Sequence, residues 1–150
     1  MKKLFVIRHG DYNDSLRLSE LGKEQMTQVS EKILTRLNGH SMLMLSSTAP
    51  RAIDSANAIS KVLLIDYEEH EMLWDDDSHW GNLNESIKLI NSKKNLADAI
   101  LVVTHFDFTE ELPEHYAKEV LNISSLIGTV GKGEAWEIDF EEPTATHISI

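Results

Sequence analysis

The fold is decided by Lys3-Leu4-Phe5-Val6-Ile7-Arg8-His9-Gly10-Asp11-Tyr12, an apolar run that stops at an arginine, a histidine and a glycine. The apolar part has the length and composition of a strand buried on both faces, as in the centre of a parallel sheet. Ligands of open α/β sheets bind outside the carboxyl ends of the strands. We therefore expect Arg8 and His9 at a binding site, with Gly10 allowing a tight turn beside the ligand.

Length and composition indicate one domain, residues 1–150, of an ordinary globular protein. The chain has 150 residues and 41% hydrophobic residues, and no segment approaches the roughly 18–20 apolar residues of a membrane span. Lys2-Lys3 resembles the start of a signal peptide, but Arg8 cuts the apolar part too short. The absence of cysteine excludes disulfides, thiol catalysis and cysteine-bound zinc. We expect a cytoplasmic protein.

The charge balance limits the partners. A formal net charge of -11 argues against nucleic acid or an anionic membrane surface as a partner. The same charge repels an anionic substrate at long range, so a phosphate site requires a local cluster of cations. Oligomeric state is not predicted.

A second apolar run, residues 42–45, predicts another buried strand, and it ends in serines followed by Pro50 and Arg51. Proline suits the first turn of a helix, because its missing N–H would have no partner there. Arg51 then lies at a helix N-terminus, where free amides favour anions. A guanidinium group also binds phosphate oxygens in pairs. This junction predicts an anion site.

A third buried strand, residues 100–104, ends in His105, and the chain closes with a hairpin that pairs 134–140 with 146–150. Helical spacing is found over 19–37, 50–62 and 82–91, and a short strand is predicted over 64–67. The predicted fold is a three-layer α/β sandwich, with a mostly parallel sheet between helices on both faces. His9 and His105 then lie close together at one sheet edge.

Four islands of the sequence resemble the histidine phosphatase superfamily, the phosphoglycerate-mutase-like proteins. The islands are Arg8-His9-Gly10 after the first strand, Leu18-Ser19-Glu20-Leu21-Gly22-Lys23-Glu24-Gln25, Ser46-Ser47 with Arg51-Ala52, and Val102-Val103-Thr104-His105. The small size of the chain resembles the compact, phosphohistidine-phosphatase-like branch. A mutase is less expected, because the chain has no large insertion that would enclose a substrate.

This resemblance implies a metal-independent phosphatase without a cofactor that acts on a phosphorylated small molecule or phosphoprotein. His9 would be the nucleophile, carrying the phosphoryl group as phosphohistidine, and it needs a nearby carbonyl or carboxylate to fix its tautomer. Arg8, Arg51 and His105 would hold the phosphoryl oxygens. Asn13 lies where some members place a phosphate-contacting asparagine; its other interpretation is a turn former.

The general acid is left open. Asp77-Ser78-His79-Trp80-Gly81 is similar to the mutase pattern and favours Asp77 as the acid, whereas an alignment anchored on Leu73 favours Asp75. Asp76 and Glu71 lie in the same stretch, which can also be a plain acidic loop. Residues 106–116 depart from the superfamily and border the site. Their acidic groups would select a cationic or peptide-like substrate, or would weaken catalysis.

Two other classes of function remain. One is a metal-dependent hydrolase, since histidine and carboxylate are the ligands left without cysteine; its ligands would be His9, Asp11, Asp75 or Asp77, His79 and His105. The other is a catalytically weakened superfamily member that binds a phosphorylated partner.

Overall fold

A computed structural model of the chain, which describes residues 1–37 and 39–150, contains a six-stranded sheet in the order β3-β2-β4-β1-β5-β6. The first four strands in sequence run parallel to one another, and β5 lies antiparallel to both β1 and β6. The strands are β1 (Lys3–Arg8), β2 (Met42–Ser46), β3 (Tyr67–Glu69), β4 (Ala99–Thr104), β5 (Ala135–Asp139) and β6 (Thr144–Ile148).

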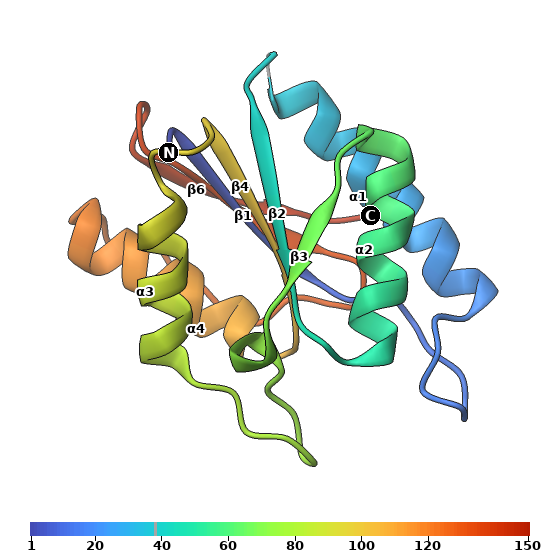
Figure 1. Cartoon of the computed structure of the whole chain (residues 1–150). Coiled ribbons are helices and arrows are strands. Elements are labelled where there is room, and N and C mark those ends of the chain that lie inside the picture. Colours follow the sequence, from blue (N-terminus) through green and yellow to red (C-terminus); the bar gives the residue numbers. More distant parts are fainter. Residues whose placement is uncertain (38) are drawn as a thin grey trace.

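Helices cover both faces of this sheet (Figure 1). On one face lie α1 (Glu20–Leu37) and α2 (Pro50–Leu63); on the other lie α3 (Leu83–Lys93) and α4 (Phe108–His115). Two short turns complete the described elements, the 3-10 turn η1 (Glu71–Leu73) and the π-helical turn η2 (Tyr116–Val120). The expected three-layer α/β sandwich with a mostly parallel sheet is confirmed.

Alternating side chains of the central strand build two separate cores. Phe5 and Ile7 of β1 pack with α1 and α2, whereas Leu4 and Val6 pack with α3 and α4. All four side chains are fully buried. This two-sided burial is why the strand reads as a continuous apolar run instead of an alternating one.

The short strand β3 begins later than predicted. The sequence predicted a strand over 64–67, but Leu64 ends α2 in the left-handed conformation, with φ 57° and its amide bonded to the carbonyl of Ser60. Its side chain is 86% exposed. An apolar residue that terminates a helix was taken for the first residue of a strand.

The carboxyl ends of β1, β4 and β2 lie side by side. Arg8 pairs with Thr104, and Ser46 pairs with Val103, so the three strands end at nearly the same level. Each is followed by one of the predicted functional segments. None of the helices described here is long and apolar enough to cross a membrane.

Candidate active site

His9 follows β1 and is held at both its backbone and its ring. The His9 amide donates to the carbonyl of Thr104 on β4 at 3.1 Å. Its Nδ1 lies 2.9 Å from the carbonyl oxygen of Gly10 and therefore carries the proton, because a carbonyl only accepts. This is the tautomer-fixing carbonyl that the sequence led us to expect. Nε2 therefore carries a lone pair and is the nitrogen that can act as a nucleophile.

Glycine is required beside this histidine. A Cβ atom at Gly10 would lie 2.8 Å from the carbonyl oxygen of Gly22, and one at Gly22 would lie 2.1 Å from the carbonyl oxygen of Asp11. The first turn of α1 thus packs directly on the backbone that follows His9. The glycine of the second resembling island, Gly22, has a steric role here.

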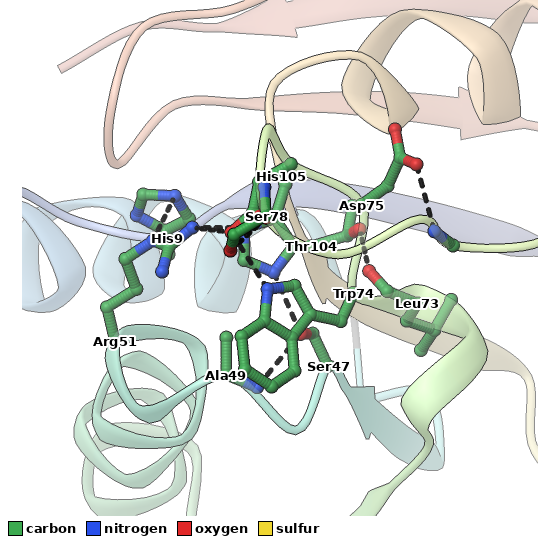
Figure 2. A network of polar contacts seen from close by, with 12 residues as sticks. His9, Ser47, Ala49, Arg51, Leu73, Trp74, Asp75, Ser78, Thr104 and His105 are labelled. Atoms are coloured by element: carbon green, nitrogen blue, oxygen red, sulfur yellow. Dashed lines mark hydrogen bonds and ion pairs between the residues drawn. The ribbon is translucent and has the colours of Figure 1, made fainter. Parts of the chain in front are cut away.

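Arg51 joins the two histidines. Its Nε donates to His9 Nε2 at 3.3 Å, and its Nη2 lies 3.3 Å from Nδ1 of His105. The two imidazole rings are 5.0 Å apart between centroids. Arg51 begins α2 directly after Pro50, as predicted, and only 6% of its surface is exposed. Figure 2 shows Arg51, His9 and His105 converging.

Both histidines are neutral near pH 7. The pKa of His9 is lowered to about 4, mainly by burial; the hydrogen bond to the Gly10 carbonyl acts against this shift, and the charges of Arg51 and Arg8 add to it. Burial also lowers the pKa of His105 to about 2, with additional effects from His9 and Arg51. A neutral imidazole keeps the lone pair that nucleophilic attack requires.

Ser47 holds the far side of His105. Its Oγ is 2.8 Å from His105 Nε2 and accepts the Ala49 amide at 3.2 Å. Because Arg51 Nη2 faces Nδ1, the contacts fit a ring protonated at Nε2 that donates to Ser47. A serine hydroxyl can also donate, so His105 can change tautomer without losing this bond.

Arg8 has an unsatisfied donor. Its Nη1 donates to the Val130 carbonyl at 3.1 Å, and its guanidinium carbon lies 4.8 Å from the centroid of the Phe106 ring. Its Nε is buried and has no hydrogen-bond partner among residues 1–37 and 39–150. Burial lowers the pKa of Arg8, and the charge of Arg51 contributes, although Tyr12 acts in the opposite direction. A buried donor without a partner indicates a place for an anion.

Asp76 is the aspartate that reaches the cluster. Its Oδ2 accepts from Arg51 Nη2 at 2.5 Å and from Trp74 Nε1 at 2.8 Å, and its Oδ1 accepts the amide and hydroxyl of Ser78. Partial burial opposes ionisation, but these hydrogen bonds hold the pKa of Asp76 well below its usual value. Asp76 is therefore an ionised partner of Arg51.

The two predicted acids lie on either side of Asp76. Figure 2 shows the carboxylate of Asp75 turned away from His9 and Arg51, where Oδ1 accepts the Gly81 amide at 2.9 Å. Asp77 is exposed at the tip of the turn that joins Asp76 to His79. Three consecutive aspartates look equivalent in the sequence; the turn decides which one faces the arginine.

Asn13 and the proposed metal ligands have other contacts. Asn13 Oδ1 accepts the amides of Ser15 and Arg17, so this side chain shapes its own loop. Asp11 pairs with Lys132 at 3.2 Å, and the ring of His79 stacks on Trp74. Within residues 1–37 and 39–150, no three His, Asp or Glu side chains are grouped so that they could hold a metal ion.

The side chains described above surround a cavity of about 300 Å³. Sequence reasoning missed Tyr12 in its lining and Ser47 behind His105. It named Asp76 only among the alternatives for the general acid, and the half-exposed Phe106 only within the segment 106–116 that borders the site. Strand-end position alone marks Phe106, whereas nothing in the sequence distinguishes Asp76. The lining residues are Arg8, His9, Tyr12, Arg51, Asp75, Asp76, Asp77, His105, Phe106 and Asp107.

At the level of sequence, no protein-family profile matches this chain, and no curated protein is detectably similar to it. Solved structures do match. A protein histidine phosphatase SixA in complex with tungstate superposes with a TM-score of 0.73 at 16% identity, over 98% of this chain and 94% of that one. A protein proposed to be SixA from Agrobacterium tumefaciens gives 0.71 at 19% identity, over 99% and 96%.

A mycobacterial glucosyl-3-phosphoglycerate phosphatase, Rv2419c, gives a TM-score of 0.67 at 17% identity, over 98% of this chain and 97% of that one. Each match covers nearly the whole of both chains. The chain therefore has the same overall fold as these solved phosphatases.

Proposed function

We propose that this protein is a metal-independent phosphatase that works through a phosphohistidine on His9. The observation that carries the proposal is the ring of His9: its Nδ1 proton is bound by the Gly10 carbonyl, while Nε2 faces Arg51 inside the cavity. Solved structures with the same fold are named phosphatases, and two are complexes with the phosphate-like groups tungstate and VO3.

The reaction has two steps. The lone pair of His9 Nε2 attacks phosphorus and forms an N–P bond, while the bond from phosphorus to the leaving group breaks and that group takes a proton. Water then attacks the phosphohistidine, the N–P bond breaks, and orthophosphate leaves with His9 neutral again. Splitting one difficult displacement into two is the usual gain of covalent catalysis.

Arg8 and Arg51 supply the positive charge around the transferring group. The orphaned Nε of Arg8 offers a donor, and Arg51 is already 3.3 Å from His9 Nε2. His105 joins them once its proton moves to Nδ1, a change that the Ser47 hydroxyl accommodates. Fixed donors of this kind account for most phosphoryl-transfer catalysis.

Asp77 is our candidate for the general acid. Asp76 is held ionised by Arg51, and Asp75 is turned toward Gly81, whereas Asp77 lines the cavity with no side-chain hydrogen bond among the described residues. If Asp77 protonates the leaving group, Asp77→Asn lowers kcat much more for an alkyl phosphate than for p-nitrophenyl phosphate, whose leaving group needs little proton assistance. Equal losses on both substrates would exclude this role.

The central test is hydrolysis of p-nitrophenyl phosphate with excess chelator, combined with trapping of an acid-labile phosphoenzyme. We expect turnover in wild type, none in His9→Gln, and label on His9. His40→Gln is the matched control, because His40 precedes β2 at the opposite end of the sheet; it should retain both signals. Chelator-sensitive turnover, or label on another residue, contradicts the proposal.

Binding of a phosphorylated partner without turnover is the second candidate. The observation in its favour is that Asp76 already occupies Arg51, so a phosphate has to compete with an internal carboxylate. Wild type that binds vanadate but gives neither product nor phosphoenzyme would select this function over the first.

A further inference from the structure

The mouth of the active-site cavity carries an excess of negative charge. Arg8 and Arg51 lie at its floor, and four aspartates line it, Asp75, Asp76, Asp77 and Asp107. Asp76 neutralises Arg51. The other three aspartates form no ion pair within the part of the chain that the structure describes.

Asp107 is free although it precedes a helix. Aspartate in this position usually accepts an amide of the first helical turn, as Asn82 does for α3 by accepting the Glu85 amide at 2.9 Å. Asp107 makes no such bond, because its own backbone is already helical at φ -67° and ψ -39°. Its exposed carboxylate lies at the cavity mouth without a structural task.

Asp77 is free for a different reason. The turn from Asp76 to His79 is closed by backbone bonds and by the contacts of Asp76 with Ser78. Asp77 takes part in none of these bonds and is exposed at the tip of the turn. Two carboxylates from different segments thus border one opening.

The surroundings add both signs of charge. Glu111, one turn after Asp107, has a raised pKa because of its burial and then because of Asp75 and Asp107 nearby. Lys132 lies 4.6 Å from the centroid of the Tyr12 ring, but it is already paired with Asp11 at 3.2 Å. The ring of Phe106, 48% exposed, also borders the mouth and already contacts the guanidinium of Arg8.

The floor of the cavity requires the opposite charge. The buried Nε of Arg8 has no hydrogen-bond partner among the described residues and can bind an anion, whereas Arg51 can bind one only in competition with Asp76. A ligand that complements both the floor and the mouth of the cavity therefore carries a phosphoryl group at one end and a positive charge at the other.

On the basis of the proposed function, we infer that the substrates are phosphoryl compounds whose leaving group bears a positive charge close to the phosphorus, such as an ammonium alcohol. The phosphoryl group lies between Arg8 and Arg51, and the cation lies beside Asp107 at the mouth of the cavity. Leaving groups that carry a carboxylate are disfavoured at the same mouth.

The test compares phosphocholine with neohexyl phosphate, in which carbon replaces the ammonium nitrogen at nearly constant shape. Because exposed ion pairs contribute little individually, we expect wild type to prefer phosphocholine by about 3- to 10-fold in kcat/KM. Because choline is also the more acidic alcohol and the better leaving group, the charge effect is read from the change of this ratio between wild type and a variant, since both proteins face the same pair of leaving groups.

Asp107→Asn should lower this ratio by about 3-fold. Glu24→Gln is the matched control: it removes one negative charge from an exposed position on α1, and the ratio should stay at the wild-type value. A wild-type ratio at or below unity, or a ratio that is unchanged in Asp107→Asn, overturns the inference.

Failure of the proposed function is visible separately. If wild type hydrolyses neither compound nor p-nitrophenyl phosphate, the phosphatase assignment fails. The charge inference is then decided by calorimetric dissociation constants for phosphocholine and neohexyl phosphate, with the same ratio expected and the same outcomes against it.

Discussion

Each end of β1 carries a cation that is shielded from solvent at least in part, and the two cations have opposite surroundings. At the amino end, Lys3 lies 2.8 Å from Glu137, which also binds Arg36, and Lys3 donates to the Arg36 carbonyl. Although burial opposes it, the hydrogen bond and charge of Glu137 raise the pKa of Lys3. At the carboxyl end, Arg8 has an unsatisfied donor and a lowered pKa.

The difference separates a structural charge from a functional one. A buried cation with a full set of hydrogen-bond partners fixes the position of a strand. A cation with an unsatisfied donor can use that donor to bind a ligand. Proteins commonly lose stability at binding sites for this reason. Removing the cation at the carboxyl end should therefore lower activity but not stability. Removing the partner of the cation at the amino end should lower stability but not activity.

Removing the charge at the carboxyl end should have the largest effect, and it should fall on activity. Arg8→Met keeps an apolar stem and deletes the unsatisfied donor. We expect kcat/KM for p-nitrophenyl phosphate to fall by roughly 10²–10³-fold, as for loss of one transition-state donor, while urea denaturation shows an equal or higher free energy of unfolding. A large loss of stability would mean that Arg8 is structural.

Breaking the pair at the amino end should affect stability instead. Glu137→Gln leaves Lys3 buried with a weakened partner, and we expect the free energy of unfolding to fall by about 3 kcal/mol. The kcat/KM of the folded protein should not change. Glu24→Gln, with the same loss of charge at an exposed position, provides the control and should leave both quantities at the wild-type level.

Acid should lower the stability that the histidines at the carboxyl ends of β1 and β4 contribute to the fold. In the folded protein the pKa values of His9 and His105 are about 4 and about 2, below the usual 6.5. The unfolded chain therefore binds more protons, and stability that is complete above pH 6.5 declines as the pH falls toward 4. Between pH 7 and pH 5 each histidine should account for about 1–2 kcal/mol.

Urea denaturation of wild type and His105→Gln across this pH range measures that contribution. The variant should show a shallower decline, because one of the two depressed groups is gone. Identical slopes for both proteins would show that His105 is not kept neutral by the fold.

The smallest effect should come from Asp76, the internal partner of Arg51. Asp76→Asn keeps one acceptor oxygen, which can serve Ser78 or Trp74 but not both, and removes the charge that competes with phosphate. We expect orthophosphate and vanadate to inhibit at about 3- to 10-fold lower concentration, in line with one charged contact. Unchanged inhibition together with a collapse of kcat would instead identify Asp76 as the acid.

The fold was predictable because a buried strand is a continuous apolar run, and the polar residues that follow it mark where it ends. Val102-Val103-Thr104-His105 and Arg8-His9-Gly10 end parallel strands that are neighbours in the sheet, so topology alone brings both histidines together. The placement of Arg51 followed from Pro50 and the need of a helix N-terminus for anions. These inferences required no knowledge of side-chain packing.

The acidic loop could not be predicted, because its geometry depends on contacts between distant segments. Thr104 donates to the Leu73 carbonyl at 2.7 Å, and Trp74 stacks on His79 with ring centroids 4.3 Å apart. Together these contacts orient the turn so that Asp76 faces Arg51. Hydrophobic periodicity carries no information on such a turn, and three consecutive aspartates give none either.

The close contact between Gly10 and Gly22 bears on how this protein tolerates sequence change. Neither residue has a functional group, yet one added methyl at either would collide with backbone behind the nucleophile. A search by chemistry alone would pass over both positions. A saturation mutagenesis screen for activity should find both glycines as intolerant of substitution as the histidines. Steric contact with the backbone therefore limits the sequences open to this protein as strictly as charge does.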